Sequence, residues 1–410
     1  MPNATASFDV LIAGGGLVGA SLAAALAPLP IRIAVVEAIP FGSRGQPSYD
    51  DRVTAVSFGS RRIFESIGLW SGIAAEATAI RRIHVSDRGR PGAAHLDAKE
   101  AGVEALGYVV PNRIIGQALS TFLPAQSNIT LIAPAKLQDF TAQDDCVRAR
   151  LEADSGPMEI NARLLVAADG ANSRIREQLG IAGHSWDYAQ SAIICNVSVE
   201  RPQHGVAFER FTDSGPLALL PMGEERYALV WTVAQSELEA MLAMDDAALL
   251  ALAAAKFNGR FGRFLKAGKR QSYPLSLVRA ASQLHGRCVI AGNAAHSLHP
   301  IAGQGFNLSL RDVAALTETL AEIVRTGGDP GQDERLAEYV RMRRRDQTGT
   351  ALFTDFLVRV FSNPLLPVRL LRNAGLLGVE LLPPLRHALM RHNMGLAGRL
   401  PGLARGVSLK

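Results

Sequence analysis

Paired cysteines and metal-ligand spacings are absent from the sequence. Its 410 residues contain three cysteines, Cys146, Cys195 and Cys288, and no two of them form a CxxC motif. Neither a disulfide framework nor a redox dithiol is predicted, which is typical of a protein in the reducing cytoplasm. His296 and His299 have no carboxylate or cysteine at ligand spacing, so no metal site is predicted.

Long apolar runs are also absent. No stretch of 18 uninterrupted apolar residues occurs, so no membrane-spanning helix is expected. The first eight residues lack a basic segment, and the apolar run that follows contains three consecutive glycines, which argues against a signal peptide. The net charge of +5 is modest for this length, and no nucleic-acid partner is predicted. With 48% apolar residues, the chain can fill two domains, or one large domain with an insertion.

Positive charge gathers at the C-terminal end. Residues 359–410 contain eight Arg or Lys residues and one acid, Glu380, interleaved with leucines. This composition suits an anionic membrane surface at the inner face of the membrane, or a negatively charged partner. It equally suits a helical cap that packs on its own domain with its arginines in water. The sequence leaves both alternatives open.

The N-terminal segment has the pattern of a dinucleotide-binding βαβ unit. Strands are predicted at 8–13 and 31–36 with a helix at 17–27 between them, and the second strand ends at Glu37. The sequence from Gly14 to Gly19 matches GxGxxG. Gly14 permits the tight turn, Gly16 lets the backbone approach a pyrophosphate beside Leu17 and Val18 at the helix start, and Gly19 allows close helix packing. Glu37 can accept hydrogen bonds from ribose hydroxyls.

Two later segments extend this pattern. A strand at 164–168 ends at Asp169-Gly170, and Ser173 is placed to cap a following helix, although the segment alone could be a tight turn. A second strand at 288–291 runs into Gly292, and a glycine turn precedes a helix that opens near Phe306. Backbone N–H groups from Gly303 to Asn307 would face the ring end of a flavin, where negative charge accumulates on reduction. Ligand-facing loops this far apart indicate one long cofactor, and FAD is the candidate.

Residues 183–275 change to a strand-rich pattern. Strands are predicted at 192–199, 206–211, 217–221 and 227–233, with an alanine-rich helix at 236–257. Further helices are predicted at 61–67 and 112–123, and a strand at 80–87 leads into a polar segment at 88–101. We therefore predict an α/β fold with a discontinuous Rossmann-like domain (1–80, 102–182, 275–333), an inserted sheet domain (81–101, 183–274) and a helical tail (334–410).

The glycine fingerprint at 14–19, the Asp169-Gly170 segment and the segment at 292–307 together resemble those of the group A flavoprotein monooxygenases of the para-hydroxybenzoate hydroxylase fold. The second fingerprint of that family, Asp-Gly followed by Ser-x-x-Arg, is present as Asp169-Gly170 and 173–176. The third, usually Gly-Asp, reads Gly292-Asn293. This asparagine, together with the segments 50–57, 85–89, 207–212, 215–222 and 299–307, is similar to the branch of ubiquinone-biosynthesis hydroxylases.

The resemblance implies an FAD enzyme that uses NAD(P)H without a second Rossmann domain. In that family a C4a-hydroperoxyflavin transfers a hydroxyl group to a phenol ring, here a polyprenylated methoxyphenol hydroxylated at C1 or at another ring position. Arg52 and either Arg113 or Gln117 would contact FAD, although Arg52 could instead pair with Asp50 or Asp51. The predicted cofactor-binding residues are Gly14, Gly16, Leu17, Val18, Gly19, Glu37, Arg52, Arg113, Gln117, Asp169, Gly170, Gly292, Asn293, Pro300, Gly303, Gln304, Gly305, Phe306 and Asn307.

The residues that act on the substrate are harder to predict. Tyr227 and His299 are weak candidates for a base that deprotonates the phenol, because a structural role accounts for each of them more readily. Alternation along the inserted strands predicts a substrate face made of Phe208, Phe211, Leu217, Leu219, Pro221 and Trp231. A prenyl-lipid reductase of related fold and a flavin-bound scaffold in a ubiquinone biosynthetic complex remain alternatives. A flavin halogenase is not supported, because its Trp-x-Trp motif is absent.

Overall fold

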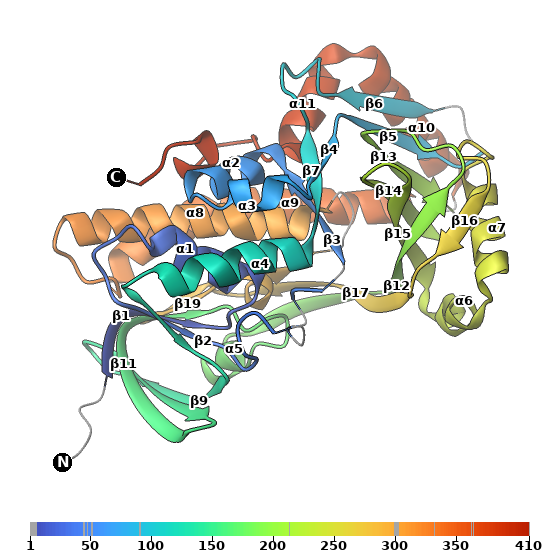
Figure 1. The fold of residues 1–410 in the computed structure, drawn as a ribbon. Helices are drawn as coiled ribbons and strands as arrows, with labels where there is room; N and C mark the ends of the chain where they lie inside the picture. Colours follow the sequence, from blue (N-terminus) through green and yellow to red (C-terminus); the bar gives the residue numbers. More distant parts are fainter. Residues whose placement is uncertain are drawn as a thin grey trace.

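A computed structural model describes residues 6–43, 46, 48–50, 52–89, 92–212, 214–298, 303–331, 333–361, 363 and 365–409. Two large sheets lie at opposite ends of an elongated molecule, and long helices run between them (Figure 1). Two predicted site residues, His299 and Pro300, lie outside the described residues, as does Asp51.

The first sheet has a parallel core built from segments far apart in the sequence. Its order is β18-β19-β11-β1-β2-β8, and β9 and β10 add an antiparallel hairpin to β11. The strands are β1 (Ala6–Ala13), β2 (Ile33–Val36), β8 (Ile129–Ile132), β9 (Ala135–Ala142), β10 (Val147–Ala153), β11 (Gly156–Ala167), β18 (Leu284–His285) and β19 (Cys288–Ile290). Val10, Leu11 and Ile12 are fully buried, because a parallel sheet is covered on both faces.

Helices α1 (Leu17–Leu26), α4 (Asn112–Phe122) and α8 (Gln304–Arg325) pack with this sheet. The predicted strand at 164–168 is the end of β11, which begins eight residues earlier because residues 156–162 pair with β10. Short helix α5 (Arg174–Gln178) follows, and the Ser173 hydroxyl accepts a hydrogen bond from the Arg176 N–H at 3.1 Å. The predicted helix cap is therefore confirmed.

The second sheet has the order β20-β17-β12-β15-β14-β13-β5-β6, with β16 paired to β12. Its strands are β5 (Arg82–Asp87), β6 (Ala93–Asp97), β12 (Gly183–Val199), β13 (Val206–Thr212), β14 (Gly215–Met222), β15 (Arg226–Ala234), β16 (Phe264–Ala267), β17 (Gln271–Ala280) and β20 (His296–Ser297). The four predicted strands are confirmed. The segment predicted as merely polar contains β6, which forms because residues 93–97 alternate in burial and pair with β5.

Two helices rather than one follow β15. They are α6 (Leu238–Ala243) and α7 (Asp246–Lys256), and the predicted single helix is wrong because Asp245 starts a new helix by accepting a hydrogen bond from the Ala248 N–H at 2.8 Å. These helices cover the outer face of the second sheet (Figure 1). Buried side chains of the sheet and of α7 form one apolar cluster there.

A small third sheet joins the two halves. It consists of β3 (Val53–Ser57), β4 (Thr78–Ile80) and β7 (Gly107–Pro111), with α2 (Phe58–Ser66) and α3 (Trp70–Ala74) beside it. The strand predicted at 80–87 is divided between β4 and β5. The predicted domain boundaries remain a proposal, and β17 crosses the one placed at 274/275.

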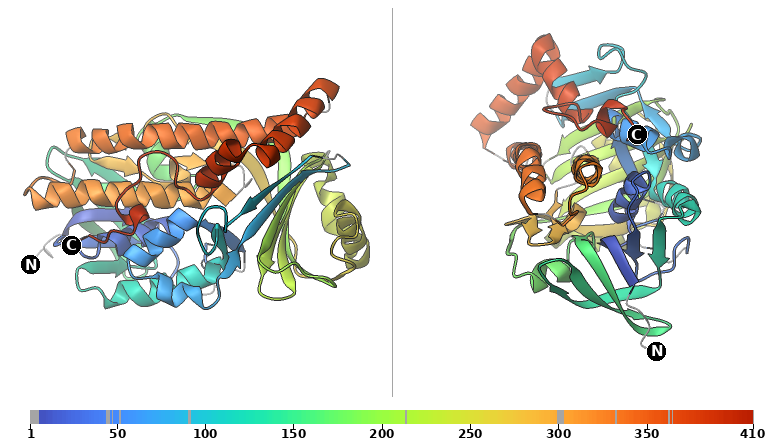
Figure 2. Two further views of the ribbon diagram at one scale, coloured as in Figure 1. Left: turned by 90° about the horizontal axis from the view of Figure 1, so that it is seen from above. Right: turned by 90° about the vertical axis from the view of Figure 1, so that its left-hand side faces the viewer.

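The C-terminal region is helical, as predicted. Helix α9 (Asp333–Phe361) runs beside α8 and reaches the second sheet, and α10 (Leu366–Leu381) and α11 (Pro383–Asn393) project from the body (Figure 2). The chain then returns to α2 and α8 through a short 3-10 turn (Leu403–Arg405). Among the described residues, no helix is both long and apolar enough to cross a membrane.

Candidate active site

A cavity of about 1250 Å³ lies between the glycine loops of the first sheet, the inner face of the second sheet and the C-terminal helices. Pockets for a single small molecule measure about 300–1000 Å³, so this cavity has room for a cofactor and a second ligand. Its surface is mostly apolar at the second sheet and polar at the glycine loops. Predicted cofactor residues that line it are Gly16, Leu17, Val18, Arg52, Gly170, Gly292, Asn293, Gly303, Gly305, Phe306 and Asn307.

The N-terminus of α1 forms one end of the site. Gly14 has φ +105°, a backbone conformation that favours glycine, and a Cβ atom added there would lie 2.4 Å from the Ala168 oxygen. Gly19 lies against the same turn, since its Cβ would be 1.9 Å from the Gly14 oxygen. Gly16 caps the helix without a side-chain hydrogen bond, and no acid stands in the first turn. The free N–H groups of this turn are therefore suited to an anion such as a pyrophosphate.

The N-terminus of α8 opens on the same cavity. Gly303 precedes the helix with φ +60°, and the first turn contains neither a side-chain cap nor an acid. Asn307 fixes this turn to β3: its Oδ1 accepts a hydrogen bond from the Ser57 N–H at 2.8 Å, and its Nδ2 donates to the Ala55 oxygen at 2.8 Å and to the Gly303 oxygen at 2.7 Å. Two uncapped helix N-termini thus face one cavity, which gives positive potential at both ends of a long ligand.

The two predicted acidic residues are held by backbone groups. Glu37 accepts hydrogen bonds from the Gly15 N–H at 2.7 Å and the Ile39 N–H at 3.0 Å, which places its carboxylate against the glycine turn. Asp169 accepts a hydrogen bond from the Ile175 N–H at 3.3 Å through Oδ2. Its Oδ1 is buried without a partner among the described residues, beside the cavity-lining Gly170. This oxygen can accept a hydrogen bond from a bound ligand.

Arg52 lies in the cavity wall and also pairs with Asp50, with 2.5 Å between Nε and Oδ2. The ion pair with Asp50 that the sequence offered is confirmed, whereas contact of Arg52 with FAD stays a prediction. The other two candidates are not brought to the cavity. Gln117 is exposed on α4, and Arg113 on the same helix pairs with Glu76 at 2.7 Å. Gly14, Gly19, Asp169 and Gln304 are adjacent to lining residues rather than part of the lining. Glu37 is not in the lining either, and its carboxylate contacts Gly15 and Ile39.

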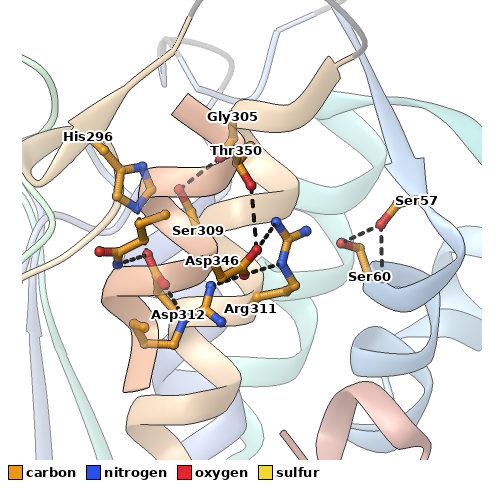
Figure 3. A network of polar contacts seen from close by, with 11 residues as sticks. Ser57, Ser60, His296, Gly305, Ser309, Arg311, Asp312, Asp346 and Thr350 are labelled. Atoms are coloured by element: carbon orange, nitrogen blue, oxygen red, sulfur yellow. Dashed lines mark hydrogen bonds and ion pairs between the residues drawn. The ribbon is translucent and has the colours of Figure 1, made fainter. Parts of the chain in front are cut away.

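Beneath the α8 turn lies a buried polar network that joins α8 to α9 (Figure 3). Asp312 is 2.5 Å from His296 Nε2 and accepts a hydrogen bond from Arg343 Nε at 2.6 Å. Arg343 and Arg311 both pair with Asp346, at 2.5 and 2.8 Å. Burial alone would raise the pKa of Asp312, but the Arg343 charge and the His296 hydrogen bond lower it to about 2. His296, one of the two loop histidines, therefore has a structural partner.

The substrate face predicted from the second sheet needs correction. Phe211 lines the cavity. Phe208 borders it but, like Leu217, Leu219 and Trp231, lies in the apolar cluster against α7, and Pro221 is buried outside the lining. The lining side chains of these strands are Pro216, Ala218, Leu220, Val230 and Thr232. The prediction chose the bulkier of two alternating sets, and that set fills the core beneath the helices.

Tyr227 is also part of that core. Its hydroxyl donates a hydrogen bond to the Gln203 oxygen at 2.8 Å and accepts one from the Gln203 N–H at 2.9 Å, and burial raises the pKa of Tyr227. It is not in contact with the cavity, so the structure does not support it as the base. The sequence analysis missed a different lining residue, Glu209, although strand alternation with Phe211 would have placed both on the same face.

The residues at the cavity fit FAD. The α1 turn and Arg52 would hold the pyrophosphate region, and the α8 turn would hold the flavin ring. Glu37, which accepts a hydrogen bond from Gly15 of the α1 turn, stays a candidate for the ribose hydroxyls. Gly305 has open space where a Cβ would be, and Gly170 does as well. Their backbones can therefore approach a flat ligand. The fold and this site define an FAD-dependent monooxygenase of the aromatic hydroxylase class.

Comparisons with known proteins agree. A family described as "FAD binding domain" matches residues 7–353. The chain is 40% identical over 404 residues to ubiquinone hydroxylase UbiL of Rhodospirillum rubrum, covering 98% of this chain and 93% of that protein. It is 33% identical to the 3-demethoxyubiquinol 3-hydroxylase of Escherichia coli strain K12, covering 95% and 98%. The chain belongs to this FAD-binding family and, within it, to the ubiquinone-biosynthesis hydroxylases.

Among solved structures, p-nitrophenol 4-monooxygenase PnpA from Pseudomonas putida DLL-E4 is similar in fold. It superposes with a TM-score of 0.80 at 18% identity, covering 96% of this chain and 100% of that chain. The fold expected from the sequence, the para-hydroxybenzoate hydroxylase fold, is confirmed.

Proposed function

We propose that this flavoprotein monooxygenase hydroxylates the ring of a polyprenylated methoxyphenol in ubiquinone biosynthesis, at C1. The observation that carries the proposal is the course of the cavity. It runs from the α8 turn along the apolar inner face of the second sheet and reaches the surface between Phe356, Leu371 and Leu385 of the C-terminal helices. An aromatic ring can lie at the α8 turn while a prenyl chain extends outward along apolar side chains. The relatives named above support a ring of this type.

Bound FAD, reduced by NAD(P)H, activates dioxygen and supplies the hydroxyl group. The protein residues bind and orient the ring and exclude water. Ala218, Val230 and Ile194 give the ring side of the cavity a flat apolar wall, and Phe211 and Phe361 stack 3.5 Å apart where α9 closes over the sheet. A ring held against this wall would face the flavin. This position favours hydroxylation of the ring over release of hydrogen peroxide.

The function is tested with the purified flavoprotein, NADH or NADPH, and a short-chain prenyl methoxyphenol. We expect substrate-dependent oxygen consumption and a product heavier by one oxygen atom. Product with two added hydrogens and no oxygen uptake would instead identify a prenyl-lipid reductase, and no turnover with any phenol would favour a scaffold. Mass analysis of the quinone precursor that accumulates when the protein is lost identifies the ring position.

We further propose that the protein reaches its substrate at the membrane surface through α10. Leu366, Leu370, Leu377 and Leu381 form an exposed leucine stripe on this helix, with 61, 63, 41 and 73% of each side chain accessible. The spacing of four and seven residues places them on one face. An uncovered apolar stripe beside the cavity mouth suits insertion among lipid chains.

The basic residues of the tail offer less positive charge to a membrane surface than their number in the sequence indicates. Arg372 is buried and pairs with Asp87 at 2.7 Å, Arg386 pairs with Glu100 at 2.8 Å, and Arg359 pairs with Asp355 at 2.7 Å. Arg372 and Arg386 thus fasten α10 and α11 to the body, whereas the Arg359 pair lies within α9. The exposed leucines support the membrane alternative, which stays a proposal. Removing everything after residue 345 would be a poor test, because it deletes Asp346 from the buried network.

Replacing Leu366, Leu370 and Leu381 with glutamine should weaken binding to vesicles. Each exposed leucine contributes on the order of 1–2 kcal/mol when it enters lipid, so the triple change lowers the partition coefficient roughly 100-fold or more. Flotation with vesicles of phosphatidylcholine and phosphatidylglycerol measures it. The matched control replaces Leu242 and Leu265, which are exposed at the far side of the second sheet. Equal binding of both variants would rule out α10 as the membrane contact.

A further inference from the structure

Glu209 is the single carboxylic acid among the described residues that line the cavity. It belongs to a row that crosses five neighbouring strands. Val85 of β5 is paired with Glu209 of β13, Glu209 with Ala218 of β14, Ala218 with Val230 of β15, and Val230 with Ile194 of β12. All five members line the cavity, and the other four are apolar. The carboxyl group thus stands alone on the wall along which the substrate ring is proposed to lie.

The side chain has no partner in the fold. Within the described part of the chain, its carboxyl group makes no hydrogen bond or ion pair, whereas the neighbouring Asp87 on β5 is fully engaged by Arg372. A buried carboxyl group without a partner is costly and is rare in stable folds. Glu209 is partly exposed and borders the cavity. Its open hydrogen-bonding positions are therefore available to a ligand.

The surroundings determine how the carboxyl group titrates. Burial raises the pKa of Glu209 to about 7. The other ionisable side chains in the cavity wall are Arg52 and Tyr273 at the cofactor end and Arg372, which Asp87 neutralises. Arg210, next on β13, interacts with Asp87, Arg88 and Arg260. No charge from these elements offsets the effect of burial on Glu209, so the group is close to half ionised at neutral pH.

We propose that Glu209 is the general base that removes the phenolic proton of the substrate, an inference that rests on the proposed hydroxylase function. The O–H bond of the phenol breaks and the proton passes to a Glu209 oxygen. The electron pair left on the phenol oxygen raises the electron density of the ring, and a ring carbon forms a bond to the hydroxyl oxygen that bound FAD would supply. The O–O bond of that oxygen donor breaks, and the second oxygen atom keeps the electron pair and leaves as water. That carbon then loses its hydrogen as a proton, aromaticity returns, and Glu209 gives its proton back to the phenolate oxygen. The two electrons come from NAD(P)H and the oxidant is dioxygen, as the established class of activity supplies.

The role suits the chemistry of the groups involved. A free phenol has a pKa near 10, so few molecules are ionised at neutral pH without a base. A base is most effective when its own pKa lies near the working pH, and such a group typically accelerates a reaction by about 10²–10⁴-fold. An arginine or lysine at this position could stabilise a phenolate but could not accept its proton.

Glu209→Gln tests the proposal, because it keeps the shape and removes the base. In the FAD-loaded protein we expect product formation to fall about 10²–10⁴-fold, while NAD(P)H oxidation continues and oxygen appears as hydrogen peroxide. The wild-type rate of hydroxylation should fall as the pH drops below about 7, and the variant should lose this dependence. A ring-fluorinated substrate has a more acidic phenol and depends less on a base. With this substrate, the difference in hydroxylation rate between the wild type and Glu209→Gln should be smaller. Glu225→Gln, an exposed acid in the β14–β15 turn, is the matched control.

The outcomes are distinguishable. If the wild-type protein hydroxylates no phenol, the proposed function fails first. If it does and Glu209→Gln keeps the same rate and pH profile, the base is another group. We do not expect Glu209→Gln to unfold the protein. Folding raises the pKa of Glu209 from 4.5 to about 7, so its contribution to the free energy of unfolding is complete below pH 4.5 and is lost as the pH rises through about 7. The variant should therefore melt at or above the wild-type temperature at pH 8, with equal FAD content.

Discussion

Gly19→Ala is expected to yield a protein without bound FAD. The added methyl group would lie 1.9 Å from the Gly14 oxygen, 3.1 Å from Ile12 Cγ2 and 3.2 Å from Ala168 Cβ. The nearest atom belongs to the backbone, so α1 must move away from β1 and the phosphate-binding turn is displaced. We expect FAD affinity to fall by at least about 100-fold and the free energy of unfolding by roughly 1–3 kcal/mol or more. The flavin-to-protein ratio after gel filtration and a denaturant titration measure the two effects.

The matched control is Gly349→Ala. This glycine is exposed within α9, and a Cβ there would meet no atom within 4 Å. Alanine is the better helix former by about 1 kcal/mol, so this variant should be at least as stable as the wild type and should retain FAD. Normal FAD content in the Gly19 variant would show that the turn adapts and that the packing argument is wrong.

The cofactor half of the site could be predicted because its signals are local. The turn conformations of Gly14 and Gly303 and the helix starts beside them follow from short sequence patterns, and the structure places both helix N-termini at one cavity. A glycine fingerprint carries this information because only glycine tolerates the conformation and the close approach that a nucleotide requires.

The substrate half could not be predicted to the same extent, because it depends on which face of a strand is covered. Alternation separates Ala218 from Leu219, but it does not say that α7 packs on the leucine side. Bulk made Leu219 the more attractive choice, whereas an enzyme that binds a flat ring needs small residues beside it. Glu209 was missed for the same reason. Alternation puts it on the same face of β13 as Phe211, but the sequence does not show that this face borders the cavity.

The long-range ion pairs also could not be predicted from the sequence. Arg343 and Asp346 belong to the segment predicted only as a helical tail (334–410), yet they lie beneath the α8 turn with Asp312 and Arg311. Two arginines and two aspartates thus balance in the core, and they join the helix that would hold the flavin ring to the helix that closes the substrate cavity. Balanced buried charges are stable only while every partner is present.

Asp312→Asn should therefore destabilise the protein strongly. The asparagine fits the space, but Arg343 and Arg311 are left with Asp346 as the one carboxylate they share. Removing one partner of a buried pair costs about 3–5 kcal/mol, and we expect a melting temperature lower by roughly 10 °C. FAD should also dissociate more readily, because the α8 turn loses its support. Circular dichroism melts and flavin release on heating report the two effects.

The stability difference between the wild type and Asp312→Asn should depend on pH. The pKa of Asp312 is lowered to about 2 in the folded protein, so its contribution to stability is complete above the unfolded value of 3.8 and is lost as the pH falls toward 2. The difference between wild type and variant should be largest near neutral pH and should shrink in acid. Glu338→Gln removes an acid of similar chemistry from an exposed pair with Arg341 on α9, and such pairs contribute about 0–1 kcal/mol. A small effect of Asp312→Asn, similar to that of this control, would mean that the network does not support the flavin end of the site.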